Sequence, residues 1–270
     1  MPDGSSTGIG VSVKRKEDYR FLVGEGKYTD DINRPNQTYS YMLRSNSAHA
    51  NFSLNIENAS KLKGVVKIFV GEDMEVGGIP CGWQVDSKDG TPMREPAHPP
   101  IAKNKVRYVG EIIAVIIADS IEEAKNAAEL VDVNYKDIPV IINMKDALEA
   151  KNGLVHDEIE TNICYDWEIG DSSAVDLAMA EAAHITSLDI KNNRLIPNAM
   201  ETRAAIGDYE HATGQYTLYT TSQNPHVIRL LMGAFVLGLP EHKLRVIAPD
   251  VGGGFGSKIF HYAEEAIVTW

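Results

Sequence analysis

The sequence predicts an α/β or α+β protein in which two successive regions each combine strands and helices. Residues 105–138 are predicted to form strand, helix and strand in quick succession, which is a compact α/β unit. Residues 216–258 are predicted to form strand, helix, strand and a glycine-rich loop. The chain has 270 residues, enough for one large domain or two ordinary ones. Its content of 43% hydrophobic and 24% charged residues is typical of a soluble globular protein.

Composition argues against several classes of protein. The formal charge of −12 and the lack of a Lys/Arg stripe disfavour a nucleic-acid partner. The longest apolar stretch, 112–118, is too short to span a membrane, and residues 1–10 do not have the pattern of a signal peptide. Two distant cysteines, Cys81 and Cys164, are too few for a disulfide scaffold or an iron–sulfur site. We therefore expect a cytoplasmic protein.

The first region shows strand signals and one well-marked helix. Residues 1–15 are expected to form a flexible arm, and Gly24–Asp31 a turn-rich entry. Ser120 and Glu123 form an S-x-x-E capping box at the start of a helix. The other predicted elements of this region are strands at 38–44, 64–70 and 132–135, one or two strands within 105–118, and a long loop at 71–104.

The second region follows a predicted connector, residues 139–165. Asn224 and Pro225 are suited to begin a helix that ends near residue 237, before Gly238. The other predicted elements are a helix at 174–183, strands at 184–190, 204–210, 216–221 and 243–248, and a further helix after residue 258. The chain ends in an apolar run, 266–270, without a helix stop signal. We therefore expect a piece of a longer or split chain; the alternative is a helix that docks its own end.

Residues 216–258 carry the chemistry. If their two strands are parallel, the crossover is right-handed and both following loops lie at the sheet edge where ligands bind. Gln223 and the glycines at 252–256 would then face one ligand. Glycine lets backbone amides approach an anion closely, and a run of such amides forms an anion-binding nest. With Lys258 as a nearby cation, this pattern suits an anionic cofactor with oxo or phosphate groups.

Familiar nucleotide motifs do not fit this loop. The P-loop pattern requires a glycine where Ser257 or Lys258 stands. The dinucleotide pattern G-x-G-x-x-G fails at its third glycine, again at Ser257. A nucleotide-binding domain and a plain structural turn remain as alternative interpretations.

Several segments resemble the large subunits of molybdenum hydroxylases, the family of xanthine dehydrogenases, aldehyde oxidases and carbon monoxide dehydrogenases. Gly252–Lys258 resembles the family's G-G-G-F-G-x-K signature, and Thr221–Pro225 resembles its T-x-Q-N-P signature. Met200–Arg203 is similar to M-E-P-R, with Thr202 in place of proline. Further similar segments, in the family's order, are Gly26–Asp31, Arg44–Ala50 and Val106–Glu111.

The resemblance implies the fold and the partners. It implies a hammerhead α/β domain at 16–138, followed at 166–270 by the first part of a molybdopterin-binding α/β domain. The implied cofactor is a molybdenum-pterin, either molybdopterin or its cytosine dinucleotide. The implied activity is oxidation of an aldehyde, an N-heterocycle or carbon monoxide with water. Electrons would pass to a 2Fe-2S small subunit and an FAD-binding medium subunit, in a dimer of heterotrimers.

The resemblance also implies the site residues. Gln223 would donate a hydrogen bond to an oxo ligand of molybdenum, and Gly253, Gly254, Phe255 and Gly256 would contact the cofactor. No residue is expected to ligate the metal directly. Ile259 stands where purine oxidisers and many aldehyde oxidisers carry a glutamate, which leans the resemblance toward the carbon monoxide dehydrogenase-like branch.

Family members are much longer than this chain, so the general base and most pterin contacts are expected beyond residue 270. The 270 residues alone are therefore expected to be inactive. The alternative is a non-catalytic binding or assembly module of the same fold.

Other polar residues receive ordinary interpretations. Glu201 and Arg203 form either a catalytic pair or, as we expect, a structural ion pair. His49 and His98 are expected at the surface or in loops. His184 and His226 lack companions at metal-ligand spacing.

Overall fold

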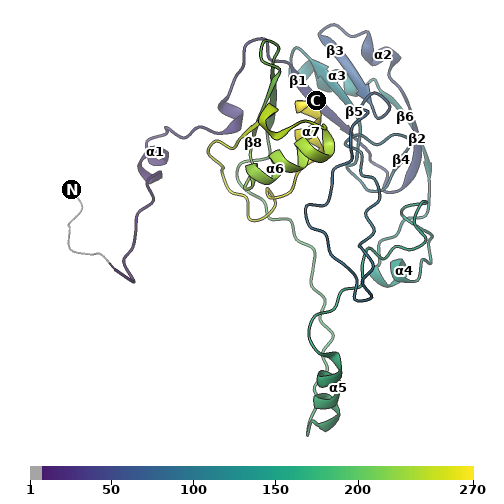
Figure 1. The fold of residues 1–270 in the computed structure, drawn as a ribbon. Coiled ribbons are helices and arrows are strands. Elements are labelled where there is room, and N and C mark those ends of the chain that lie inside the picture. Colours follow the sequence, from purple (N-terminus) through teal and green to yellow (C-terminus); the bar gives the residue numbers. More distant parts are fainter. Residues whose placement is uncertain (1–7) are drawn as a thin grey trace.

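A computed structural model describes residues 8–270 of the chain (Figure 1). The expected arm at 1–15 therefore lies partly outside the described residues. The entry segment carries a short helix, α1 (Asp18–Leu22), without buried residues, and a 3₁₀ turn, η1 (Thr29–Asp31). Three three-stranded sheets follow. In the described part of the chain, no helix combines the length and apolarity needed to cross a membrane.

The first sheet is antiparallel, with strand β5 (Ile112–Ala118) between β1 (Tyr39–Arg44) and β3 (Val65–Val70). Nearly every residue of β5 is buried, as its unbroken apolar sequence requires. Two helices accompany this sheet, α2 (Glu57–Ser60) and α3 (Ile121–Ala128).

Helix α3 begins as the sequence predicts. The Ser120 hydroxyl accepts a hydrogen bond from the Glu123 amide at 3.2 Å and donates one to the Glu123 carboxylate at 2.9 Å. The second bond differs from a full capping box, in which the glutamate would accept from the backbone of the capping residue. The cap therefore satisfies one of the amides that a helix start leaves without a partner.

The second sheet contains a strand that was not predicted from the sequence. Strand β2 (Ala50–Asn55) lies between β4 (Lys105–Val106) and β6 (Asp132–Asp137), antiparallel to both. Its apolar residues alternate with asparagine and serine, which are poor strand formers, so the pattern is weak. The predicted stretch 105–118 divides into two strands, β4 and β5, that belong to different sheets.

The third sheet has strand β8 (Gln215–Thr220) between β7 (Ala205–Glu210) and β9 (Leu244–Ile247). Strands β8 and β9 are parallel, which confirms the crossover that the sequence predicts. The elements that follow β8 are the crossover helix α6 (Pro225–Leu231), its π-helical extension η2 (Met232–Val236), the turn η3 (Glu241–Lys243) and, after β9, helix α7 (Ala263–Thr269).

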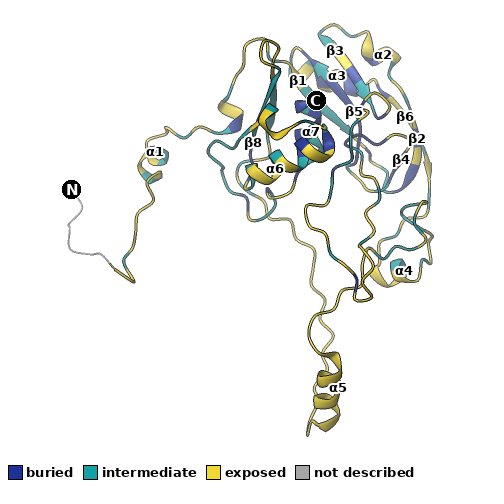
Figure 2. Cartoon of the chain, in the orientation of Figure 1, coloured by how far each residue is buried: buried dark blue, intermediate teal, exposed yellow. Residues whose placement is uncertain are grey.

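One prediction in the second region is wrong. Residues 184–190 form no strand, and residues 164–198 are all exposed. Helix α5 (Ser172–Glu181) lies within this segment, which extends away from the rest of the molecule (Figures 1 and 2). A strand needs a neighbour to accept and donate its backbone hydrogen bonds. No described residue supplies one here.

The predicted connector, 139–165, contains a short helix, α4 (Met144–Leu148). Beyond this helix, Asp157 of the connector forms an ion pair with Lys105 of the second sheet, in which the Lys105 Nζ lies 2.7 Å from the Asp157 carboxylate.

A single apolar cluster joins the two regions. Its buried members are Met74, Ile79, Ile101, Ile112 and Val115 from the first region, and Leu218, Ile228, Met232, Val236, Leu244, Ala266 and Ile267 from the second. Helix α7 packs so closely on β7 that a Cβ at Gly207 would lie only 1.7 Å from the Val268 carbonyl oxygen. The Trp270 ring contacts the Phe69 ring edge-on, with centroids 5.0 Å apart. The apolar residues of α7 are thus used in packing.

Candidate functional site

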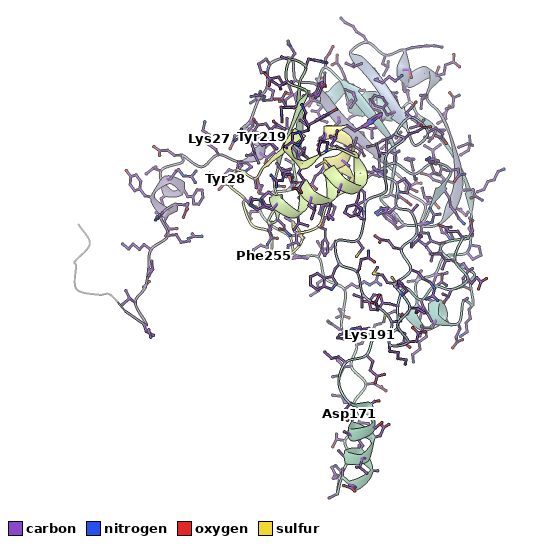
Figure 3. The ribbon with its side chains drawn as sticks, in the orientation of Figure 1. Lys27, Tyr28, Asp171, Lys191, Tyr219 and Phe255 are labelled. Atoms are coloured by element: carbon purple, nitrogen blue, oxygen red, sulfur yellow. The ribbon has the colours of Figure 1, made fainter. Side chains whose placement is uncertain are left out.

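The glycine-rich loop leaves the sheet at the end of β9 and lies beside residues 221–224, which follow β8. Both segments extend from the carboxyl ends of parallel strands, where ligands of α/β sheets bind. The loop has left-handed backbone at Gly253, Phe255 and Gly256, with φ of 97°, 49° and 86°. Such a φ is rare for a phenylalanine. The Phe255 side chain is largely exposed (Figure 3).

Gln223 is held against this loop by its side-chain oxygen. The Oε1 atom accepts hydrogen bonds from the amides of Gly256, at 3.0 Å, and Lys258, at 3.3 Å. The backbone N–H of Gln223 in turn donates to the Lys258 carbonyl at 2.9 Å. Since backbone amides can only donate, the side-chain carbonyl must face the loop. The Nε2 group is left as a donor with no hydrogen-bond acceptor among residues 8–270.

With Gln223 in this position, a side chain at residue 254 would have to displace the Gln223 side chain. A Cβ on Gly254 would lie 2.2 Å from Gln223 Oε1. The predicted proximity of Gln223 to the glycine loop is therefore present in the structure.

The loop also contains three consecutive amides without a partner. The N–H groups of Gly253, Gly254 and Phe255 have no hydrogen-bond acceptor in the described residues, whereas Gly252 and Gly256, on either side, donate to side chains. A run of unpaired amides in a loop with left-handed residues is the arrangement of an anion-binding nest.

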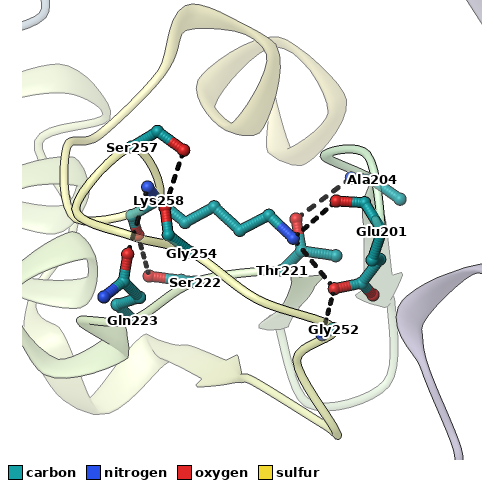
Figure 4. A network of polar contacts seen from close by, with 9 residues as sticks. All are labelled: Glu201, Ala204, Thr221, Ser222, Gln223, Gly252, Gly254, Ser257 and Lys258. Carbon is teal, nitrogen blue, oxygen red and sulfur yellow. Dashed lines mark hydrogen bonds and ion pairs between the residues drawn. The ribbon is translucent and has the colours of Figure 1, made fainter. Parts of the chain in front are cut away.

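Lys258 was expected to face an anionic ligand, but its side chain points into the protein. Its side chain is 2% exposed, and its Nζ donates to the carbonyl and to the carboxylate of Glu201, both at 2.9 Å (Figure 4). The prediction of an ion pair between Glu201 and Arg203 is also wrong. The Arg203 guanidinium instead lies 3.6 Å from the centroid of the Tyr262 ring. Glu201 thus pairs with a residue 57 positions away rather than two.

The entry segment reaches the base of the glycine loop. Arg20 donates two hydrogen bonds to the Asp250 carboxylate, one of them at 2.7 Å. Asp250 also accepts from the Lys27 amide at 2.7 Å and donates its own amide to the Lys27 carbonyl at 2.9 Å. The hydrogen bond from Arg20 is the main reason that the pKa of Asp250 is lowered to about 2. These contacts place Tyr28 beside Gly252.

Two histidines are buried in the structure, and one of them was not singled out from the sequence. His49 lies in the bend before β2, so it is a loop residue as expected, but it is buried, and its Nδ1 lies 2.9 Å from the Pro139 carbonyl oxygen. His261 was not singled out by sequence, yet it is 7% exposed and neither ring nitrogen has a hydrogen-bond partner in residues 8–270. Burial lowers the pKa of His261 to about 4. Only tertiary burial distinguishes this residue, so no local sequence signal reveals it.

The remaining candidates stay apart from the loop. His98 lies in the long loop, where it is exposed, and Cys81 and Cys164 are exposed free thiols. Across the described part of the chain, no group of three or more His, Cys, Asp or Glu side chains is arranged to hold a metal ion. A cavity of about 250 Å³ lies beside the loop's Lys258 end, bordered also by Arg44, Arg203, Tyr262, Glu264 and Glu265 among others.

Comparison with protein families explains the two regions. Residues 23–139 match the aldehyde oxidase and xanthine dehydrogenase α/β hammerhead domain. Residues 155–270 match the molybdopterin cofactor-binding domain. The chain belongs to the molybdenum hydroxylase large-subunit family. The fold class that the sequence resemblance implied, a hammerhead domain followed by the start of a molybdopterin-binding domain, is confirmed.

Individual relatives match over nearly the whole chain. The carbon monoxide dehydrogenase large chain of Afipia carboxidovorans is 32% identical over 95% of this chain and 32% of its own length. The nicotine 6-hydroxylase large subunit of Paenarthrobacter nicotinovorans is 32% identical over 96% of this chain and 31% of its own length. The crystal structure of quinoline 2-oxidoreductase from Pseudomonas putida 86 superposes with a TM-score of 0.84 at 32% identity, over 96% of this chain and 32% of that one.

The chain thus spans about a third of the length of these relatives. Their names are those of oxidoreductases, and the words large chain and large subunit mark two of them as parts of multisubunit complexes. Relatives named for carbon monoxide, nicotine and quinoline match at the same identity, so identity does not separate these substrates.

Proposed function

We propose that this chain forms one wall of the molybdenum-cofactor site in an oxidoreductase of the molybdenum hydroxylase family. The observation that carries the proposal is the orientation of the side-chain amide group of Gln223. Its side-chain carbonyl oxygen accepts hydrogen bonds from two loop amides, at 3.0 and 3.3 Å. The side-chain NH₂ group therefore points away from these amides and remains available as a donor. A molybdenum-pterin carries anionic oxygen groups, and fixed donors of this kind suit them.

The residues present fit such a cofactor. Gln223 Nε2 would donate to an oxo ligand of molybdenum. The unpaired amides of Gly253, Gly254 and Phe255 would face anionic groups of the cofactor, and the left-handed turn at Gly256 directs its own amide to Gln223. When bound, the cofactor supplies the two-electron oxidation of substrate with oxygen from water. The protein's part is to hold donors in place before the reaction, so that no reorganisation is needed.

The wider assignment follows the family. We infer a cytoplasmic complex, a dimer of heterotrimers, with an FAD-binding medium subunit and a 2Fe-2S small subunit. The cofactor is molybdopterin or its cytosine dinucleotide, and the substrate is carbon monoxide, an aldehyde or an N-heterocycle. Ile259 after the loop supports the carbon monoxide dehydrogenase-like branch. The general base and most pterin contacts belong to the two-thirds of the relatives' length that this chain does not span.

The test uses the purified complex that carries this chain. Molybdenum is measured by mass spectrometry, and dye reduction is assayed with carbon monoxide, aldehydes and N-heterocycles. Gln223→Ala should lower turnover per bound molybdenum while changing molybdenum content little, because one donor is lost and the loop amides remain. Gln84→Ala, at an exposed glutamine of the long loop, is the matched control and should change neither.

Loss of molybdenum in Gln223→Ala with normal turnover per remaining metal would contradict the assigned role of Gln223. A wild-type complex that contains no molybdenum would instead support the alternative, a non-catalytic module of the same fold.

A further inference from the structure

The ion pair between Glu201 and Lys258 occupies an unusual place relative to the glycine loop. Lys258 is the last residue of the segment 252–258, and its Nζ binds Glu201 twice. Gly252 is the first residue of that segment, and its amide donates to the same carboxylate oxygen, Oε2, at 2.7 Å. The Glu201 amide donates back to the Gly252 carbonyl at 3.3 Å. One glutamate therefore holds both ends of the loop (Figure 4).

The unpaired amides lie between these two points of attachment. The N–H groups of Gly253, Gly254 and Phe255 donate to no described residue, and the Gly254 carbonyl accepts within the loop itself, from the Ser257 amide and hydroxyl, both at 2.8 Å. The positions of these residues therefore depend on how the two ends of the segment are held. Phe255 also has a left-handed backbone, with φ of 49°. Strained backbone of this kind persists only where the surrounding structure holds it.

Burial of the pair indicates a role other than simple stabilisation. The Lys258 and Glu201 side chains are 2% and 14% exposed, and removing two charges from water offsets much of their attraction. The second carboxylate oxygen of Glu201 is buried without a hydrogen-bond partner in the described residues. The orientation of the carboxylate is thus set by Lys258 and Gly252.

We propose that Glu201 and Lys258 are positioning residues that form a clasp, which fixes residues 252–258 so that the amides of Gly253, Gly254 and Phe255 stay open for an anionic group of the cofactor. The proposal rests on the proposed function for the identity of that group. The clasp itself is a property of the protein, so it can be measured without cofactor or substrate.

The test is hydrogen exchange in the intact complex, together with molybdenum content. Lys258→Met keeps the length of the side chain and removes its charge, and Glu201→Gln removes the opposite charge at similar size. In both variants the amides of Gly252, Gly256 and Ser257 should exchange about tenfold faster, because the hydrogen bonds that they make depend on the clasp. The amides of β5, residues 112–118, should keep their wild-type exchange, and molybdenum content should fall.

The chain offers a matched control. Lys105 is also nearly buried and paired, with Asp157, but lies in the other region. Lys105→Met should not accelerate exchange at Gly252, Gly256 and Ser257. Lys258→Arg, which restores a cation, should recover part of both the protection and the molybdenum content.

Unchanged exchange of the loop in Lys258→Met and Glu201→Gln would overturn the proposal. So would equal acceleration in β5, since the pair would then act on global stability alone. A loosened loop with wild-type molybdenum content would refute the role toward the cofactor and leave the proposed function standing. A wild-type complex without molybdenum would overturn the proposed function and the cofactor role together, while exchange would still report whether the clasp holds the loop.

Discussion

Replacing Leu218 by alanine should destabilise both regions of the molecule together. Leu218 lies on β8, is 0% exposed, and belongs to the apolar cluster that also contains Ile101, Ile112 and Val115 of the first region. Removing a fully buried leucine side chain leaves a cavity and costs about 3 kcal/mol. If the two regions unfold as one unit, this loss should raise the exchange rates of the most protected amides about 100-fold.

The assay is hydrogen exchange of the β5 amides, residues 112–118, which lie in the region that does not contain the substitution. Leu177→Ala on helix α5 is the matched control, because that leucine is 61% exposed and its loss should change stability by less than about 0.5 kcal/mol. Faster exchange confined to β8 and β9, with β5 at its wild-type rate, would refute the reasoning. It would show that the shared cluster does not couple the two regions.

Three further outcomes are expected. Gly254→Ala should displace the Gln223 side chain and cost about 1–3 kcal/mol for its two hydrogen bonds in urea unfolding. Gly82→Ala, where a Cβ meets only one leucine methyl at 3.3 Å, should cost little; equal effects would count against the close contact. Ser120→Ala should lower stability by about 1 kcal/mol through loss of the α3 cap, and an unchanged urea midpoint would contradict this. His261 has a pKa lowered to about 4, so the folded protein favours its neutral form, and stability should fall as pH drops from 6.5 toward 4. His261→Phe should make that fall shallower; an identical pH profile would exclude His261 as its cause.

Local signals account for what the sequence predicted correctly. The helix after Ser120 and the crossover helix at Pro225 begin at residues whose chemistry favours a helix start. The unbroken apolar run of β5 required a buried strand. The proximity of Gln223 to the glycine loop could be predicted because the loops that follow two parallel strands lie at the same edge of the sheet.

Long-range contacts account for what the sequence could not supply. The sequence paired Glu201 with Arg203, two positions away, whereas only the folded chain brings Lys258 to its carboxylate. Strand β2 has weak local preference and owes its existence to β4 and β6 on either side. Residues 184–190 show the converse, because strand-like composition forms no strand without a neighbour among the described residues.

The contact between Arg20 and Asp250 bears on where this chain can be divided into domains. The hammerhead match begins at residue 23, so Arg20 falls outside the first domain as similarity defines it, and its partner lies in the second. An expression clone trimmed to the matched boundaries would keep the two hydrogen bonds between Lys27 and Asp250 but would lose the Arg20 side chain that binds the same carboxylate. Recombinant versions of this chain should therefore start before Arg20, and a domain swap should move the entry segment together with the cofactor-binding domain.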